Sequence, residues 1–175
     1  MQQSGFERTR PDGTVLEIRG SPLPGGGFVT TYADITERKR AEEKLRISEE
    51  RLRTIVETEP ECVKVVGFRG ELLEMNAAGL AMLEAGSVDE VKSHSLIAFI
   101  LPGYRAAFGD LHQRVLGGET GKLEFEVIGL RGTRRWLETH AAPMRDANGQ
   151  VTMLLGVTRD ITARKQEDAV RVSLE

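Results

Sequence analysis

Apolar and polar residues alternate along three segments in the last third of the chain, and a period of two residues is typical of half-buried β-strands. The three predicted strands are 122–128, 134–143 and 151–158. Asn148-Gly149 favours a tight turn, so it predicts a hairpin between the last two strands. Two shorter strands are predicted at 62–66 and 72–75.

Between these two groups of strands, apolar residues recur at the spacing of helices. Asn76 precedes a short apolar helix at 77–83 and is its expected N-cap. The longest predicted helix in this part is 103–116, and Gly117-Gly118 ends it. Two strands, several short helices and three strands predict an α+β domain, in which helices cover one face of an antiparallel sheet.

An earlier helix is predicted at 37–58, where charged residues dominate and Pro60 follows. Its apolar positions are spaced alternately by four and three residues, which is the stripe of a coiled coil. The stripe consists of Ala41, Leu45, Ser48, Leu52 and Ile55. The alternatives are a lone surface helix and a parallel dimeric coiled coil. We favour the coiled coil, with Leu45 and Leu52 in its interface.

One string occurs twice, each time after an apolar strand and before a charged helix. It reads Asp34-Ile35-Thr36 in the first copy and Asp160-Ile161-Thr162 in the second. Upstream, Phe6-Glu7 and the turn at Gly13 have the spacing of Phe125-Glu126 and the turn at Gly132. The two copies are therefore predicted to share three strands, and to differ in length only in the turn before the last strand.

This repeat sets the predicted domain boundaries. Residues 1–36 resemble the C-terminal three strands of an upstream domain whose front half is missing. Residues 37–58 are a helical linker, 59–162 form a complete domain, and 163–175 begin a C-terminal signalling helix.

Asp and Thr are helix-capping residues, because their side-chain oxygens accept the free amide hydrogens of a first turn. Each copy of the string is therefore predicted to be a strand-to-helix joint, which can pass a change in a sheet into a helix. The predicted relay residues are Asp34, Thr36, Asp160 and Thr162. For Asp160 we expect a cap on the outgoing helix, or an ion pair with Arg159, Arg164 or Lys165.

Composition narrows the function classes. The 175 residues are 39% hydrophobic and 29% charged, which is typical of a globular chain, and a net charge of −3 with mixed signs favours no nucleic-acid partner. Cys62 is the single cysteine, so no disulfide forms within one chain. No apolar run approaches the ~20 residues of a membrane span, so we expect a cytoplasmic protein without direct membrane contact. The sequence contains no phosphate-binding loop, kinase box or cyclase motif, and we expect no catalytic activity.

The order of elements resembles that of a PAS domain. The residues that carry the resemblance are Asn76, the segment Gly132-Thr133-Arg134-Arg135-Trp136, Pro143 and the Asp-Ile-Thr string. The resemblance is complete over 49–162, and 5–36 resemble the last three strands of another copy. It implies a five-stranded sheet of order 2-1-5-4-3, with a small cavity under the helices and an outer face that packs on flanking helices. Tandem domains of this kind resemble the sensory half of bacterial histidine kinases and of cyclic-dinucleotide enzymes.

The resemblance to the flavin-binding branch of the family implies which side chains face the cavity. In that branch the positions of Val127, Leu137, Thr139, Gly156 and Thr158 face the ligand. The predicted ligand-binding lining adds Phe99, Phe108, Phe125 and Leu154 to these five residues. The outer face would then carry Trp136, Met153, Leu155 and Val157, ready to receive a helix or a second subunit. The alternative is a cavity filled by the chain's own side chains, with Tyr104 and the three phenylalanines as the fillers.

No cofactor is assigned from the sequence. Flavin photochemistry is not expected, because this chain has Leu96 where that branch has its reactive cysteine. Some PAS domains bind haem through a histidine on the long helix, and His112 lies on helix 103–116. It is the single metal-ligand candidate, one position off the buried stripe.

Two function classes follow. The first is a non-catalytic sensory and dimerisation module of a bacterial signal-transduction protein, such as a sensor histidine kinase. Its expected partners are a second copy of itself, an effector domain in the parent chain and a small-molecule ligand. The alternative is a haem-bound gas or redox sensor that uses His112.

Overall fold

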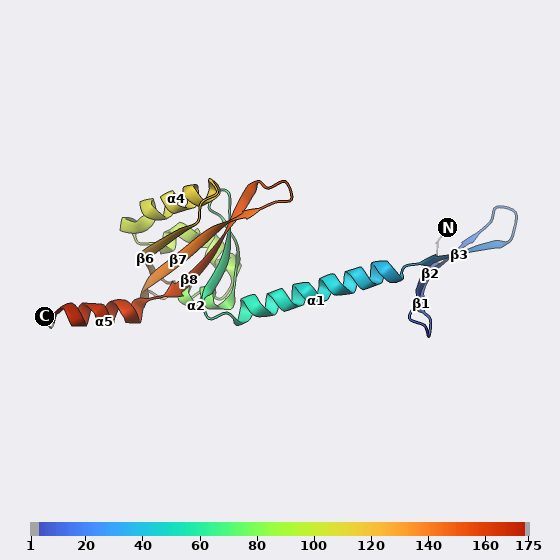
Figure 1. Ribbon diagram of the computed structural model, residues 1–175, viewed down its shortest axis with the longest axis horizontal. Coiled ribbons are helices and arrows are strands. Elements are labelled where there is room, and N and C mark those ends of the chain that lie inside the picture. The colour runs from blue at the N-terminus through green and yellow to red at the C-terminus, as the bar shows by residue number, and fades with distance from the viewer. Residues whose placement is uncertain (1–3, 174–175) are drawn as a thin grey trace. The chain divides into compact units, whose positions relative to one another are not determined.

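The computed structural model describes residues 4–173, and its contacts divide the chain into two compact units at Thr54. The first unit begins with three antiparallel strands in the order β1-β2-β3 (Figure 1). These strands are β1 Ser4–Thr9, β2 Val15–Pro22 and β3 Phe28–Asp34. Helix α1, Thr36–Thr58, follows directly.

The first sheet has a small core of its own. Leu16 and Ile18 of β2, together with Ile35, are buried, whereas β3 is exposed along its whole length. The exposed large apolar side chains of this unit include Phe6, Leu23, Phe28, Val29 and Tyr32. A three-stranded sheet needs a covered apolar face for independent stability. Within this unit that cover is incomplete.

Helix α1 carries the predicted apolar stripe on an open surface. None of its residues is buried, and the side chains of Leu45 and Leu52 are each 60% exposed. Charged side chains pair along the helix, with Arg46 contacting Glu43 at 2.8 Å and Glu50 at 2.9 Å. The stripe therefore lacks a partner within a single described chain, and the coiled coil stays a prediction.

The second unit contains a five-stranded antiparallel sheet of order β5-β4-β8-β7-β6. Its strands are β4 Cys62–Gly67, β5 Leu72–Met75, β6 Gly121–Ile128, β7 Arg134–Arg145 and β8 Val151–Asp160. Counted within the unit, this order is 2-1-5-4-3. Figure 1 shows the helices between β5 and β6 gathered on one face of the sheet. The predicted α+β architecture is confirmed.

The helices between β5 and β6 are short and individually capped. They are α2 Ala77–Leu83, α3 Val88–His94, the 3-10 helix η1 Leu96–Phe99, and α4 Pro102–Leu116. Asn76 caps α2 as predicted, because its side chain accepts a hydrogen bond from the Gly79 N–H. Ser87 caps α3 in the same way. The core lies between these helices and the inner sheet face, and includes Val66, Val91, Val115, Phe125 and Val127.

The last two strands run further than predicted, and β8 continues to Asp160 at the joint itself. Helix α5, Thr162–Ser173, therefore begins almost directly where the sheet ends. The β7–β8 hairpin closes through a hydrogen bond from Asp146 N to Gln150 O, and Gly149 adopts φ +79° there, a conformation that favours glycine. In the described part of the chain, no helix is long and apolar enough to cross a bilayer.

Candidate functional site

Two small cavities lie between the inner face of the second sheet and the helices, each of about 20 Å³. The structure places all of the predicted lining residues around them. Phe99, Phe108, Phe125, Val127, Leu137 and Thr158 line the first cavity, and Phe108, Thr139, Leu154 and Gly156 line the second. Both cavities are small.

Aromatic side chains fill much of this interior. The rings of Phe108 and Phe125 meet edge to face with centroids 5.3 Å apart. The expectation for Tyr104 was wrong, because its ring packs against Trp136 at 5.6 Å and its hydroxyl donates to Glu126. Tyr104 therefore belongs to the edge of the sheet, and the phenylalanines occupy the interior.

Lys64 of β4 lies between the two cavities and lines both. Its residue is 5% exposed, and Nζ donates a hydrogen bond of 2.6 Å to Thr158 Oγ1. Thr158 in turn donates to Thr139 Oγ1 at 2.8 Å. Burial lowers the pKa of Lys64, because a charged amine loses its hydration there. Sequence reasoning gave Lys64 no role, although strand alternation places it on the face of the buried Cys62.

The interior does not fit haem. His112 is half-buried at the edge of the second cavity, and its Nε2 lies 3.2 Å from the carbonyl oxygen of Phe68. Neither cavity approaches the size of a porphyrin. Among the described residues, no three His, Cys, Asp or Glu side chains gather into a group that could hold a metal ion. Cys62 is buried, and burial raises the pKa of its thiol.

The joint at Asp160-Ile161-Thr162 attaches the start of α5 to β7, the neighbour of β8 in the sheet, through hydrogen bonds to Trp136, and a further hydrogen bond to Asp160 lies within the joint. Thr162 Oγ1 accepts from Trp136 N at 2.9 Å, and Ile161 N donates to Trp136 O at 2.9 Å. Thr162 N donates to Asp160 Oδ1 at 2.9 Å. Ile161 is 3% exposed and anchors the joint in the core. The start of α5 is thus fixed to the backbone of β7 at a single residue, Trp136.

The first unit repeats this geometry at Asp34-Ile35-Thr36. Thr36 Oγ1 accepts from Val15 N at 2.9 Å, Ile35 N donates to Val15 O at 2.9 Å, and Thr36 N donates to Asp34 Oδ1 at 2.9 Å. Ile35 is buried, as Ile161 is. The two copies therefore share a joint of the same construction, and Val15 is the counterpart of Trp136.

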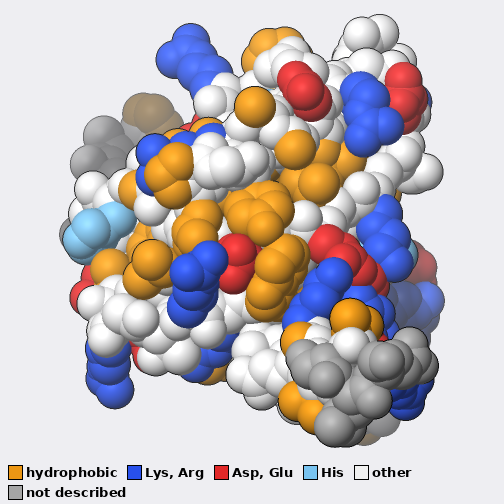
Figure 2. All heavy atoms as spheres, turned by 90° about the vertical axis from the view of Figure 1, so that its left-hand side faces the viewer, with side chains coloured by type: hydrophobic (Ala, Val, Ile, Leu, Met, Phe, Trp, Pro, Cys, Tyr) orange, Lys and Arg blue, Asp and Glu red, His pale blue; other side chains and the backbone are white. Residues whose placement is uncertain are grey.

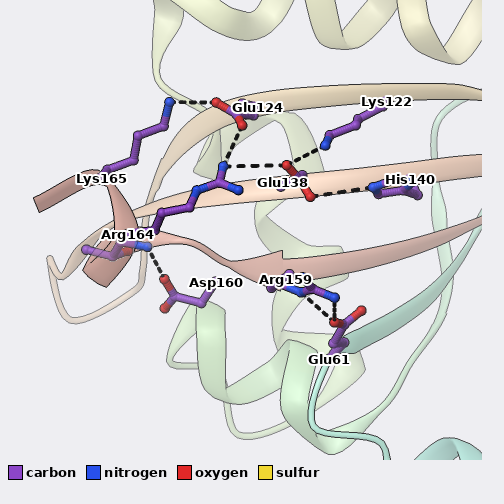
Figure 3. Close-up of polar contacts among 10 residues, drawn as sticks. Glu61, Lys122, Glu124, Glu138, His140, Arg159, Asp160, Arg164 and Lys165 are labelled. Atoms are coloured by element: carbon purple, nitrogen blue, oxygen red, sulfur yellow. Dashed lines mark hydrogen bonds and ion pairs between the residues drawn. The ribbon is translucent and has the colours of Figure 1, made fainter. Parts of the chain in front are cut away.

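Ion pairs hold the first turn of α5 against the outer face of the sheet (Figure 3). Arg164 lies 2.6 Å from Glu124 and 3.6 Å from Glu138. Lys165 lies 2.6 Å from Glu124, and its ammonium is 4.8 Å from the centre of the Trp136 ring. We call these five residues the α5 latch. The first unit has the same arrangement, with Arg38 3.9 Å from Glu17 and Lys39 2.8 Å from Glu7.

These contacts correct the predicted alignment of the repeat. They match Glu7 with Glu124, whereas the sequence spacing matched it with Glu126. In the first copy, the cross-strand pair that contains Val15 is the last one before the turn of the hairpin. In the second copy, two further cross-strand pairs lie between Trp136 and the turn, namely Arg135 with Val127 and Arg134 with Ile128. The expectation that the copies differ only in the final turn was therefore wrong. The first hairpin differs too.

Asp160 has an ion-pair partner that the sequence did not suggest. Its Oδ2 lies 3.5 Å from Arg135 Nε on β7, in place of Arg159, Arg164 or Lys165. Arg159 instead reaches Glu61 at the start of β4, with 2.6 Å between Nη2 and Oε1 (Figure 3). The end of β8 is consequently tied to the strands on both of its sides.

We expect the contribution of Glu138 to stability to depend on pH. The amine of Lys122, 2.7 Å away, donates a hydrogen bond that lowers the pKa of Glu138 from 4.5 to about 2. Because the folded pKa lies below the unfolded one, the contribution is complete above about pH 4.5 and is lost as the pH falls toward about 2.

The measurement is the difference in free energy of unfolding between the wild type and Glu138→Gln, followed through the fluorescence of Trp136, the single tryptophan. The difference should stay constant above about pH 5 and shrink below it. Glu119→Gln, which removes a carboxylate that is 62% exposed, is the control and should change little at any pH. A Glu138 difference that is unchanged down to about pH 3 contradicts the expectation.

The outer face of the second sheet carries two open grooves of about 460 Å³ each. The first is lined in part by Val56, Val63 and Leu73, the second in part by His140 and Val157, and Leu155 borders both. Seen from the end where α5 leaves the unit, hydrophobic side chains lie among basic and acidic ones (Figure 2). Leu155, which was predicted to lie on the outer face, is half-buried, and its role in an interface stays a prediction.

The fold defines an α+β domain with one antiparallel sheet, helices on its inner face and a joint to an outgoing helix. A family model described as "PAS fold" matches residues 56–166, and another with the same description matches residues 1–43. The first match covers more than half of the 175 residues. The chain belongs to the PAS fold family, and residues 56–166 are a PAS sensory domain.

Solved PAS structures share this fold. The PAS domain of an HTR-like protein from Haloarcula marismortui has a TM-score of 0.60 and 24% identity, covering 70% of this chain and 99% of that chain. A domain of a sensory box sensor histidine kinase/response regulator from Geobacter sulfurreducens has a TM-score of 0.55 and 20% identity, covering 66% of this chain and 96% of that chain.

A curated relative is a much longer protein. The methanogenesis regulatory histidine kinase of Methanothrix harundinacea (strain 6Ac) is 28% identical over 130 residues, which cover 71% of this chain. The same stretch covers 14% of that kinase. The chain thus matches a small part of a histidine kinase.

Proposed function

We propose that the chain is a non-catalytic sensory and dimerisation module of a signal-transduction protein of the sensor histidine kinase type. A ligand or partner changes the second sheet, and the joint at Asp160-Ile161-Thr162 passes the change into α5. The effector domain belongs to the same parent chain. The histidine kinase relative from Methanothrix harundinacea supports this class of effector.

The observation that carries the proposal is the duplicated joint. The copies differ in hairpin length and in the residue at the anchor point, Val15 in one and Trp136 in the other. They keep the same hydrogen bonds, and in each copy an Arg and a Lys of the outgoing helix pair with glutamates of the sheet. A helix fixed to one strand residue by backbone hydrogen bonds follows any movement of that residue. This geometry suits a relay, because it transmits displacement without new chemistry.

We also propose a second sensor upstream of the domain at 56–166. Residues 1–36 are proposed to be the last three strands of another PAS domain, whose joint feeds α1 and so reaches the domain at 56–166. The match of the family description to residues 1–43 and the open apolar surface of the first sheet support this assignment. The two sensors then act in series on one outgoing helix.

Homodimerisation uses the surfaces that a single chain leaves open. The stripe of α1, with Leu45 and Leu52, supports a parallel helical pair. The grooves beside Leu155 on the outer sheet face support contact with a further helix or a second subunit. A parallel pair of helices also aligns the two copies of α5 for an effector that works as a dimer.

The test replaces Asp160 with alanine in a fusion whose α5 continues into a histidine kinase effector. Loss of the Thr162 contact and of a partly exposed ion pair costs about 1 kcal/mol, small against the ~5–15 kcal/mol that stabilises an ordinary domain. A signalling equilibrium responds more, since ~1.4 kcal/mol shifts it about tenfold. Basal kinase output should therefore change severalfold while the domain stays folded.

Asp146→Ala is the matched control. Asp146 accepts hydrogen bonds from Asn148 N and Gln150 N in the β7–β8 loop, so the substitution removes similar contacts far along the strands from the joint. It should leave the basal output near that of the wild type. Unchanged output in Asp160→Ala, together with a large loss of stability, makes the joint a structural feature and contradicts the relay.

A further inference from the structure

The buried amine of Lys64 has no anionic partner among the described residues. Among the described residues, Lys64 is the one basic residue that lines both interior cavities. The hydrogen bond of its amine goes to the neutral hydroxyl of Thr158. A buried ammonium group without a counter-ion is unfavourable, and a methionine of similar size would fill the same space at lower cost. An anion beside Lys64 would supply the charged partner that the described side chains around its amine do not.

The residues around Lys64 indicate the chemistry of the rest of the ligand. Apart from the hydroxyls of Thr158 and Thr139, the cavity walls are mostly apolar, with Phe99, Phe125 and Leu137 among them. An apolar cavity with a few convergent polar groups is the usual form of a small-molecule site. The cavities are about 20 Å³ each, and Lys64 separates them. Because Lys64 lines both cavities, a rotation of its flexible side chain would connect them, and the combined space suits only a small ligand.

We propose that this interior binds a short-chain aliphatic carboxylate. One carboxylate oxygen accepts a hydrogen bond from Lys64 Nζ, and the hydrocarbon part packs against Phe99, Phe125 and Leu137. An ionised acceptor makes the stronger hydrogen bond, so the carboxylate replaces Thr158 as the partner of the amine. This assignment deepens the sensory function proposed above and rests on it for its consequence.

That consequence follows from the place of Thr158 on β8. Thr158 lies two residues before Asp160, and it pairs across the sheet with Thr139 of β7, the strand that holds the start of α5. When the amine of Lys64 moves away from Thr158, the Thr158 hydroxyl loses that hydrogen bond. Its contact with Thr139, which links β8 to β7, then changes. The binding event is thereby connected to the joint through two adjacent strands.

The test titrates the 175-residue chain with sodium propionate and follows thermal unfolding through Trp136 fluorescence, with calorimetry for the affinity. Sodium chloride at equal ionic strength controls for salt, and propionamide controls for the hydrocarbon part without the charge. Propionate should raise the melting temperature saturably. Sodium chloride and propionamide should not.

Two variants assign the effect to Lys64. Lys64→Met removes the amine and keeps the volume, and should weaken propionate binding by about tenfold or more, as expected for a lost hydrogen bond to a charged group. Gly156→Ala keeps the amine but places a Cβ 3.2 Å from Lys64 Cε, so it should also weaken binding. Lys92→Met removes an exposed lysine of α3 and should bind as the wild type does.

Three results overturn the assignment: no saturable shift with propionate, an equal shift with propionamide, or an unchanged affinity in Lys64→Met. The ligand proposal can fail without the relay proposal, and the two experiments distinguish these cases. If Asp160→Ala changes the basal kinase output severalfold but propionate does not bind, the ligand proposal is wrong and the relay proposal stands. Propionate binding with an unresponsive Asp160→Ala fusion keeps the ligand and removes the relay.

Discussion

Replacing Asn76 with alanine should lower the free energy of unfolding of the second unit by about 3–5 kcal/mol, because several buried polar groups lose their partner at once. Asn76 is 2% exposed. Its Oδ1 accepts from Val63 N at 3.0 Å and from Gly79 N at 3.1 Å. Its Nδ2 donates to the carbonyl oxygens of Val56 at 2.9 Å and Glu61 at 3.0 Å.

Asn76 therefore joins the end of α1, the start of β4 and the start of α2, whereas an ordinary cap serves one helix. Ser87→Ala provides the comparison, because Ser87 caps α3 by accepting only from Glu90 N. That substitution should cost about 1 kcal/mol. Urea unfolding followed through Trp136 measures both values. Equal costs for the two variants contradict the wider role of Asn76.

The double substitution Leu45→Asp with Leu52→Asp should convert a dimer into a monomer. Both side chains are 60% exposed in the single chain and stand seven residues apart on the α1 stripe. Carboxylates at these positions would face each other across a coiled-coil seam, where apolar contact drives association. Sedimentation at tens of micromolar, a concentration typical of such measurements, reads the change directly.

Ile47→Asp with Thr54→Asp is the matched control, since it introduces two carboxylates on the same helix, also seven residues apart, but off the stripe. This variant should remain a dimer. If the wild type is monomeric, the coiled-coil prediction is wrong. A control that dissociates as fully as the stripe variant shows that added charge, and not the stripe, decides association.

Strand alternation and the family resemblance together predicted most of the interior. Val127, Leu137, Thr139 and Thr158 are each at most 4% exposed, because the period of two residues fixes which face a side chain occupies once the inner face is known. Asn76 was predicted from its place before an apolar helix, where an N-cap is required. Local rules of this kind depend on neighbouring residues alone.

Features that depend on register or packing were not predictable in the same way. Arg135 pairs with Asp160 because the two strands are aligned by their hydrogen bonds, which sequence distance does not reveal. The repeat alignment was wrong for the same reason, because the first hairpins of the two copies differ in length and the sequence spacing does not show this. Lys64 escaped notice because lysine is almost always exposed, and only its alternation with Cys62 and Val66 signalled burial. The size of the cavities follows from how the aromatic rings pack.

We expect the joint to couple the PAS domain to α5 more than it holds the domain together. Hydrogen exchange of backbone amides in the wild type and Asp160→Ala, with Asp146→Ala as control, tests it most directly. Exchange should accelerate at Ile161, Thr162 and the first turn of α5, while the amides of β4 and β7 keep their protection. Equal acceleration across the whole sheet would contradict the claim, because Asp160 would then stabilise the fold and not the connection.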